Sequence, residues 1–260
     1  MRLYLCPNTG TAERLRMARL LADALLSAGL DVVLSPADSG LLFGDMSRAC
    51  PELTGCDMVL SVGGDGSVLR AAQLAVRYDL PVLGVNSVRL GYLCALSADQ
   101  AAGITAEALA ALPVQRRSLL GFRLNGEERF AVNDIVAARR RLAGTLSAGV
   151  WRGEERLLSF RGDGLIAATP TGSTAYNLSA GGPVLLWDSG CFSLTPVCAH
   201  TSGVVPLVVP DTDRYRLTVS ETGGDPADLM ADGVDMGEMR EELTIYRYHR
   251  DLKIVVSARA

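Results

Sequence analysis

The feature that most constrains this chain is a glycine-rich turn between an apolar run and a helical pattern. Asp57 to Val62 is a short apolar run of the kind that forms a buried strand. The residues Gly63–Gly66, with the sequence GGDG, interrupt it, and Ser67 to Val76 then has the apolar spacing of a helix. The sequence therefore places one carboxylate at the carboxyl end of a strand and just before a helix, which is where open α/β sheets bind ligands.

This turn predicts a phosphate-binding function. Gly63, Gly64 and Gly66 let the backbone approach a phosphate group closely, and the free N–H groups at a helix start favour an anion. The carboxylate of Asp65 would repel phosphate unless it faces an attacking hydroxyl or a metal ion, so we expect one of these beside it. The alternative is purely structural, with glycines required by sterics and Asp65 capping the helix.

Composition narrows the class of partner. The formal net charge is −4, and the densest basic run is Arg139–Arg141, so no basic face for nucleic acid is expected. Six scattered cysteines without CxxC spacing predict reduced thiols rather than disulfides or a zinc site. The first ten residues resemble a strand rather than a signal peptide, and no apolar stretch is long enough to span a bilayer. We expect a cytoplasmic protein without a membrane partner.

The order of the expected elements predicts two domains. Strands alternate with amphipathic helices up to about residue 98, which indicates a doubly wound, Rossmann-like α/β domain over residues 1–98. Ala101 to Leu112 is expected as a last helix, and successive strands with turn signals then predict a β-rich domain of layered sheets over residues 99–246. Asn125-Gly126 and Asp232-Gly233 are tight hairpin signals, and residues 223–226 a looser turn. Residues 247–260 are expected to pack back on the first domain.

A second dense stretch of polar residues is Asp163–Pro183, with the sequence DGLIAATPTGSTAYNLSAGGP. Its hydroxyls and backbone N–H groups can bind a purine edge or a phosphate, Tyr176 offers a stacking face, and Ala175 lets a flat ring lie close. The alternative is a corner of the β domain with ordinary turns and caps.

The third feature is Asn133-Asp134, which interrupts an otherwise apolar strand. An amide and a carboxylate at this place cost stability unless they are paired, and a ribose diol is a natural partner. A bulge satisfied by the hairpin backbone is the alternative. Asn86 and Arg161 are lesser candidates, and Asp232 and His200 are weaker; a lone histidine such as His200 is expected to be a hydrogen-bonded structural residue.

In their order and spacing, these motifs resemble those of the NAD kinases. The resemblance extends from about residue 57 to residue 235 and rests on GGDG, the Asn86 segment GVNSVRLGYL, Asn133-Asp134 and TPTGSTAYNLSAGGP. GGDG alone is shared with lipid kinases and phosphofructokinases, whereas the last motif is much more specific. The resemblance implies a kinase that transfers a phosphoryl group from ATP, or polyphosphate, to the 2′-hydroxyl of the adenosine ribose of NAD and gives NADP. It also implies Mg²⁺ dependence, a site between the two domains, and a homodimer or homotetramer.

The same resemblance implies roles for individual residues. Asp65 would meet the 2′-hydroxyl as base or positioning group, and the glycines at 63, 64 and 66 would hold the phosphate donor. No metal ligand is directly identifiable. The residues implied for NAD binding are Gly66, Asn86, Asn133, Asp134, Arg161, Asp163, Thr171, Thr174, Ala175 and Tyr176.

The sequence also departs from the family. Ser67 follows GGDG where threonine is usual, Val88 replaces a usual glycine, and the later Pro-His-Ser-Leu…Arg-Pro element reads Ala199–Ser202 and Val205-Pro206, without the arginine. Two other functions stay open: a related kinase acting on a lipid or sugar hydroxyl, and a non-catalytic NAD-binding regulator. The stretch around Tyr176 argues against the first, and the intact GGDG against the second.

Overall fold

The structure is a computed structural model that describes residues 1–86, 92–141, 144–221, 226–240 and 242–257. Its contacts group the chain into two compact units, Met1–Arg116 with Leu252–Ala260, and Arg117–Asp251. Each unit has its own sheet system and its own core. The domain boundaries expected at residues 98 and 246 stay a prediction.

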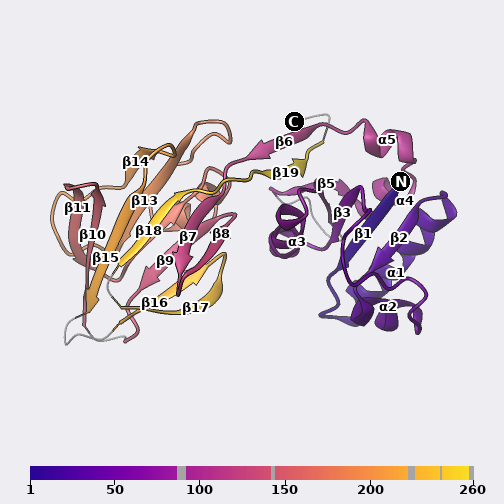
Figure 1. Cartoon of the computed structure of the whole chain (residues 1–260), viewed down its shortest axis with the longest axis horizontal. Helices are drawn as coiled ribbons and strands as arrows, with labels where there is room; N and C mark the ends of the chain where they lie inside the picture. The colour runs from indigo at the N-terminus through magenta and orange to yellow at the C-terminus, as the bar shows by residue number, and fades with distance from the viewer. Residues whose placement is uncertain (87–91, 142–143, 222–225, 241, 258–260) are drawn as a thin grey trace. The chain divides into compact units, whose positions relative to one another are not determined.

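The first unit is an α/β layer structure around a mainly parallel sheet (Figure 1). The strand order is β2-β1-β3-β4-β19-β6, and β5 also pairs with β4. The element bounds are β1 Arg2–Pro7, α1 Ala12–Ser27, β2 Asp31–Leu34, α2 Pro36–Phe43, β3 Met58–Val62, α3 Asp65–Arg77, β4 Val82–Asn86, β5 Cys94–Ser97, α4 Ala98–Ala102, α5 Ala106–Ala110, β6 Val114–Arg117 and β19 Leu252–Val255. The expected α/β fold is confirmed.

The core of this unit follows from the periodicity of its elements. The apolar face of α1 buries Ala18, Leu21, Ala22 and Leu25 against β1 and β2. Because strand side chains alternate, the other face of the sheet is free to take α3, which lies on the opposite side from α1 (Figure 1). Strand β19, from the end of the chain, adds to this sheet beside β4, with Ile254 opposite Val82.

The helix expected over Ala101–Leu112 is wrong in one respect, because two short helices take its place. Ser97 and Gln100 form a capping box that starts α4, and Gly103 is the C-cap that follows its last residue, Ala102. Thr105 then accepts a hydrogen bond from Ala108 N and starts α5. Gly103 and the second cap therefore interrupt a pattern that periodicity alone treats as continuous.

The second unit consists of two six-stranded antiparallel sheets with a shared core. One sheet has the order β11-β10-β15-β18-β7-β8 and the other β14-β13-β12-β9-β16-β17. The strand bounds are β7 Leu120–Leu124, β8 Glu127–Ala131, β9 Asp134–Ala138, β10 Leu146–Arg152, β11 Glu155–Gly162, β12 Gly164–Ala168, β13 Cys191–Val197, β14 Leu207–Pro210, β15 Tyr215–Glu221, β16 Ala227–Ala231, β17 Val234–Met239 and β18 Glu242–Arg247. Phe122, Phe192 and Tyr215 are the largest side chains buried between the sheets. The expected layered sheets are confirmed.

Both tight hairpins form where the sequence places them. Asn125 and Gly126 have φ values of 52° and 82°, and Asp232 and Gly233 have 50° and 74°, as a two-residue hairpin turn requires. The second turn joins β16 to β17. The looser turn expected at residues 223–226 lies almost wholly outside the described residues.

Candidate functional site

The first group of predicted residues lies at the carboxyl edge of the parallel sheet. Helix α3 begins at Asp65, and its N-cap is Gly64, which has no side chain to cap the helix. The Asp65 carboxylate instead accepts hydrogen bonds from Tyr92 N at 3.0 Å and Leu93 N at 3.1 Å. The capping role considered for Asp65 is therefore wrong: its half-buried carboxylate is fixed by another segment of the backbone.

The glycines of the turn differ in what requires them. Gly63 has a φ of 150°, and a Cβ there would lie 2.3 Å from Ser67 Oγ, so packing alone demands glycine. A Cβ on Gly64 or Gly66 would meet no atom of the described residues within 4 Å. These two glycines are not needed for packing, and they leave the N–H groups at the start of α3 open to a ligand.

Two further side chains, not predicted from the sequence, join this turn. Asn8, just after β1, donates from Nδ2 to Ser67 Oγ at 3.1 Å, and Arg70 Nη2 donates to the same oxygen at 3.4 Å. Asn8 could have been found from topology, since β1 lies beside β3 and the carboxyl ends of parallel strands meet at one edge. Asn86 lies at the same edge: it ends β4, next to the Gly63 N–H that donates to Val85 O. The rest of the Asn86 segment, including Val88, lies outside the described residues.

The second group lies in the β unit, around Asn133-Asp134. Thr169 donates from its hydroxyl to Val132 O at 2.6 Å and from its N–H to Asn133 O at 2.9 Å. Gly172 lies against the same backbone, because a Cβ there would be 2.0 Å from Asn133 O. The stretch after β12 is therefore fixed directly to Asn133, so two motifs separated in sequence form one surface.

Two buried polar atoms in this group have no hydrogen-bond partner among the described residues. They are Asn133 Oδ1 and Thr171 Oγ1. A buried polar atom left unpaired costs roughly 1–3 kcal/mol, so such atoms need a compensating partner. A bound polar ligand would supply one.

The segment after Thr171 is held by a buried asparagine. Asn177 donates from Nδ2 to Ser173 O at 3.0 Å and Pro183 O at 2.9 Å, and its Oδ1 accepts from Thr195 Oγ1 at 2.6 Å. Helix α6 spans Tyr176–Ser179. With Asn177 held by these hydrogen bonds, Tyr176 at the start of α6 is exposed, and Thr174 and Ala175 just before it are half-buried. This role of Asn177 could not be predicted from the sequence, because its hydrogen-bond partners are set by the folding of the loop.

Asp163 and Tyr176 line one cavity of about 330 Å³ in this unit, together with Arg139, Arg140 and Arg141. Arg139 holds Asp163 in a two-point ion pair, Nε to Oδ1 at 2.8 Å and Nη2 to Oδ2 at 3.2 Å. Arg161 is not among the residues that line the cavity: its side chain donates to Thr145 Oγ1 and its N–H to Thr201 Oγ1. The structure thus brings Asp163 and Tyr176 together and directs Arg161 elsewhere.

The cavity and the Asn133-Asp134 group lie along one strand face. Val136 and Ala138 of β9 line the cavity. Since strand side chains alternate, Asp134 faces the same side as these two residues. Asp134 is buried, and burial together with the nearby Asp232 carboxylate raises the pKa of Asp134 to about 7.

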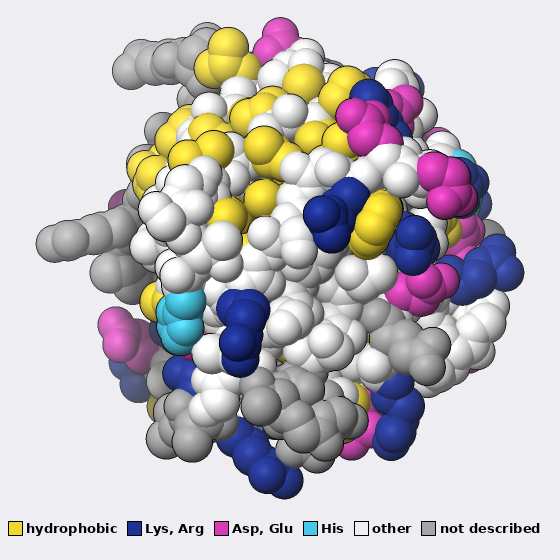
Figure 2. Space-filling view, turned by 90° about the vertical axis from the view of Figure 1, so that its left-hand side faces the viewer, with side chains coloured by type: hydrophobic (Ala, Val, Ile, Leu, Met, Phe, Trp, Pro, Cys, Tyr) yellow, Lys and Arg dark blue, Asp and Glu magenta, His cyan; other side chains and the backbone are white. Residues whose placement is uncertain are grey.

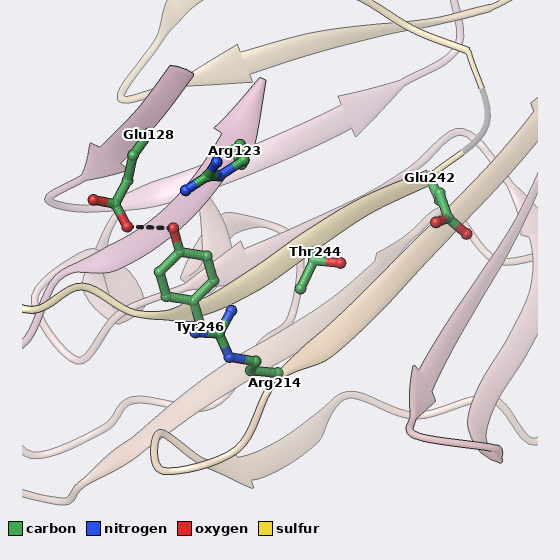
Figure 3. A pocket seen from close by; sticks show the side chains of 6 residues that line it. All are labelled: Arg123, Glu128, Arg214, Glu242, Thr244 and Tyr246. Atoms are coloured by element: carbon green, nitrogen blue, oxygen red, sulfur yellow. Dashed lines mark hydrogen bonds between the residues drawn. The ribbon is translucent and has the colours of Figure 1, made fainter. Parts of the chain in front are cut away.

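Another cavity, of about 370 Å³, contains none of the predicted residues (Figure 3). Its acidic side chains are already engaged, since Glu128 accepts from the Tyr246 hydroxyl at 2.6 Å and Glu242 pairs with Arg216 at 3.2 Å. The two arginines that line it, Arg123 and Arg214, are exposed. We do not assign it to the predicted site.

No group of three or more His, Cys, Asp or Glu side chains that could hold a metal ion occurs in the described part of the chain. Mg²⁺ commonly needs only one or two carboxylates in addition to substrate phosphates, so Asp65 beside the glycine turn fits such an ion. All six cysteines are free thiols, with Cys198 exposed, and the side chain of His200 is exposed as well. Among the described helices, none has the length and apolar character needed to cross a membrane.

Comparison with known proteins agrees with this architecture. The model of the ATP-NAD kinase N-terminal domain matches residues 8–111, and that of the ATP-NAD kinase C-terminal domain matches residues 132–254. The chain is 35% identical over 239 residues to the NAD kinase of Wolinella succinogenes, covering 89% of this chain and 78% of that protein. It is 32% identical to the NAD kinase of Ruminiclostridium cellulolyticum, covering 87% and 82%.

Solved structures show the same fold. The yeast NADH kinase complexed with NADH has a TM-score of 0.85 at 20% identity and covers 99% of this chain and 84% of that one. An NAD kinase from Archaeoglobus fulgidus in complex with ATP has a TM-score of 0.79 at 26% identity and covers 100% and 95%. With the carboxylate-bearing glycine turn, these matches define the class of the protein as a phosphotransferase. The chain belongs to the NAD kinase family.

Proposed function

We propose that this protein transfers a phosphoryl group from ATP to the 2′-hydroxyl of the adenosine ribose of NAD, giving NADP. The observation that carries the proposal is the position of the Asp65 carboxylate and the hydrogen bonds that hold it there. Its carboxylate is held by two backbone N–H groups at the end of the sheet, beside glycines whose open side leaves room for a phosphate group. A carboxylate in this place can orient a hydroxyl and accept its proton late in a loose phosphoryl-transfer transition state.

The residues of the first unit serve the phosphoryl donor. Gly64 and Gly66, with Gly63 shaping the turn, present the N–H groups of α3 to the donor phosphates. Mg²⁺ bound to those phosphates would neutralise charge that develops during transfer. Asn86, at the end of the neighbouring strand, is assigned to NAD binding together with Gly66.

The residues of the second unit bind the dinucleotide. Asn133 Oδ1 and Thr171 Oγ1 have no hydrogen-bond partner among the described residues. Asn133 Oδ1 accepts hydrogen bonds from the polar groups of the dinucleotide, Thr171 Oγ1 donates or accepts them, and the buried Asp134 follows Asn133 in the chain. Exposed Tyr176 provides the stacking face for a flat ring, with Ala175 small enough to let the ring approach. The remaining assignments are Thr174 in the same pocket, and Arg161 and Asp163 at its edge.

The enzyme is proposed to act in the cytoplasm as a homodimer or homotetramer. Figure 2 shows hydrophobic side chains gathered over one part of the displayed face. The exposed apolar residues of the second unit include Val184, Leu186, Val205 and Val208. Contiguous apolar surface of this kind is commonly covered in an assembly.

The first experiment measures NADP formation by the purified protein with NAD, ATP and Mg²⁺, through an NADP-specific dehydrogenase. Asp65→Asn is assayed beside it and should lower kcat by about 10²–10⁴, as expected when a general base is lost. NAD binding should stay within about tenfold, since the lost interaction belongs to the transition state. Equal loss of binding and rate would refute this role of Asp65.

The same assay separates the other functions. If the wild type forms no NADP with ATP or with polyphosphate, and NADH does not replace NAD, the kinase proposal fails. NAD binding without turnover would then support a regulator. Absence of binding would support a kinase that phosphorylates a different acceptor.

A further inference from the structure

Asp232 has a hydrogen-bond arrangement that its place in a hairpin turn does not require. It lies in the turn between β16 and β17, beside the start of β9. Its Oδ2 accepts from Val132 N at 2.8 Å, and its Oδ1 accepts from Asn133 N at 2.6 Å and Asp134 N at 3.3 Å. One carboxylate therefore takes the N–H groups of three successive residues.

Only a group that accepts hydrogen bonds and has no N–H or O–H of its own suits a position that faces three N–H donors. Three converging N–H groups form an anion-binding concavity, and an ionised carboxylate can accept all three bonds. The Asp232 N–H returns a bond to Asp134 O at 3.0 Å, so the contact is reciprocal. On the other edge, Thr169 binds the carbonyls of Val132 and Asn133. The backbone of the Asn133-Asp134 segment is thus fixed from both sides, while Asn133 Oδ1 keeps no partner among the described residues.

The charge of Asp232 also acts on the neighbouring acid. Burial is the larger cause of the raised pKa of Asp134, and the negative charge of Asp232 is the second. On the other side of β9, the residue opposite Asp134 is Ala168 of β12, which carries no charge. Removing the Asp232 charge should therefore lower the pKa of Asp134, while burial keeps it above its ordinary value.

We propose that Asp232 is a positioning residue of the NAD site, which fixes the backbone of Asn133 and Asp134 so that their side chains meet the dinucleotide. The proposal rests on the proposed function, because it assumes that these two side chains bind NAD. It adds a residue that does not itself touch the ligand and that lies about 100 residues further along the chain. The negative charge of Asp232 also helps to keep Asp134 protonated, so the same residue influences both the position and the ionisation of Asp134.

The test is Asp232→Asn, with Asp235→Asn as the matched control. Asparagine tolerates the positive φ of this turn but cannot accept three bonds without bringing its own N–H groups against a donor. Asp235, in the same hairpin, is exposed and accepts one bond from Gly237 N at 2.8 Å, so its variant removes the same charge without touching Asn133 or Asp134. We expect Asp232→Asn to raise KM for NAD about tenfold or more, equivalent to ~1.4 kcal/mol, with KM for ATP nearly unchanged.

A pH profile separates positioning from general support of the fold. The titration of Asp134 should appear as a midpoint in the pH profile of log kcat/KM for NAD, and this midpoint is identified by its absence in Asp134→Asn. We expect the midpoint to move to lower pH in Asp232→Asn and to stay in place in Asp235→Asn. If Asp232→Asn does not fold, Asp232→Glu keeps the charge but displaces the oxygens. We expect Asp232→Glu to raise KM for NAD with little change in the midpoint.

The outcomes distinguish this proposal from the proposed function. A wild type that neither binds NAD nor forms NADP would overturn the proposed function, and the role of Asp232 with it. An active wild type with Asp232→Asn equal to Asp235→Asn in KM and midpoint would overturn the role of Asp232 alone. A raised KM with an unmoved midpoint would also overturn it, since a merely structural contact gives that result. A wild-type KM in Asp232→Glu would do the same.

Discussion

The two kinds of glycine in the GGDG turn should respond in opposite ways to the same substitution. Alanine at Gly63 must adopt a φ of 150°, which costs of the order of 1–3 kcal/mol outside glycine. Its Cβ would also lie 2.3 Å from Ser67 Oγ and 2.9 Å from Ser67 Cβ, both buried, and such overpacking costs about 1–3 kcal/mol. Gly63→Ala should therefore lower the free energy of unfolding by about 2–5 kcal/mol.

Gly66→Ala is the matched control. Gly66 lies in the first turn of α3, and a Cβ there would meet no atom within 4 Å in the described part of the chain. Alanine in a helix is favoured over glycine by roughly 0.5–1 kcal/mol, so this variant should be as stable as the wild type or slightly more so. Its methyl group would nevertheless occupy the open side of the turn, and we expect KM for ATP to rise.

Urea denaturation and steady-state kinetics on the two variants check this reasoning. Ser67→Ala in the Gly63→Ala background removes the hydroxyl at 2.3 Å, but the Cβ contact and the positive φ remain, so it should restore only part of the loss. A Gly63→Ala protein within about 0.5 kcal/mol of the wild type would refute the steric argument. A Gly66→Ala protein with unchanged KM for ATP would refute the assignment of the open glycine to the donor.

Three further variants test the second unit. Thr171→Val replaces a buried hydroxyl that has no hydrogen-bond partner among the described residues, so the ligand-free protein should be unchanged or up to about 1 kcal/mol more stable, while KM for NAD rises; a loss of stability in urea would contradict this. Asn177→Ala removes three hydrogen bonds of a buried side chain, one of them from Thr195, and should cost about 2–5 kcal/mol in urea denaturation; a cost below ~1 kcal/mol would show that the loop does not depend on it. For Asp134, the folded-state pKa of about 7 lies above the ordinary 3.8, so folding favours the protonated form and this stabilisation is lost as the pH rises through about 7. Urea titrations at several pH values should show Asp134→Asn gaining stability relative to the wild type between about pH 4 and 8, and a difference independent of pH would contradict the raised pKa.

Local chemistry allowed much of the fold to be predicted from the sequence. Apolar spacing gave the strands and the long helices, and the Asn125-Gly126 turn gave its hairpin, because these signals act over a few residues. The prediction failed where a cap competed with periodicity, at Gly103 and Thr105. For the same reason the glycine turn was evident, whereas the partners of Asp65 were not: Tyr92 and Leu93 lie 27 and 28 residues away, and only the pairing of β3, β4 and β5 brings them close.

Asp232 shows why some functional residues stay hidden in a sequence. The turns at Asn125-Gly126 and Asp232-Gly233 have nearly the same conformation, with first φ values of 52° and 50°. In both turns, the hairpin alone explains why an Asn or Asp precedes glycine, so the neighbouring sequence does not indicate a second function for this residue. The difference is in strand order: Asn125 is exposed, whereas β16 lies beside β9, and this pairing brings the half-buried Asp232 to the three N–H groups that precede and begin that strand. A residue whose presence is already explained by a local turn can therefore also make long-range contacts, and these can be recognised only from the sheet topology.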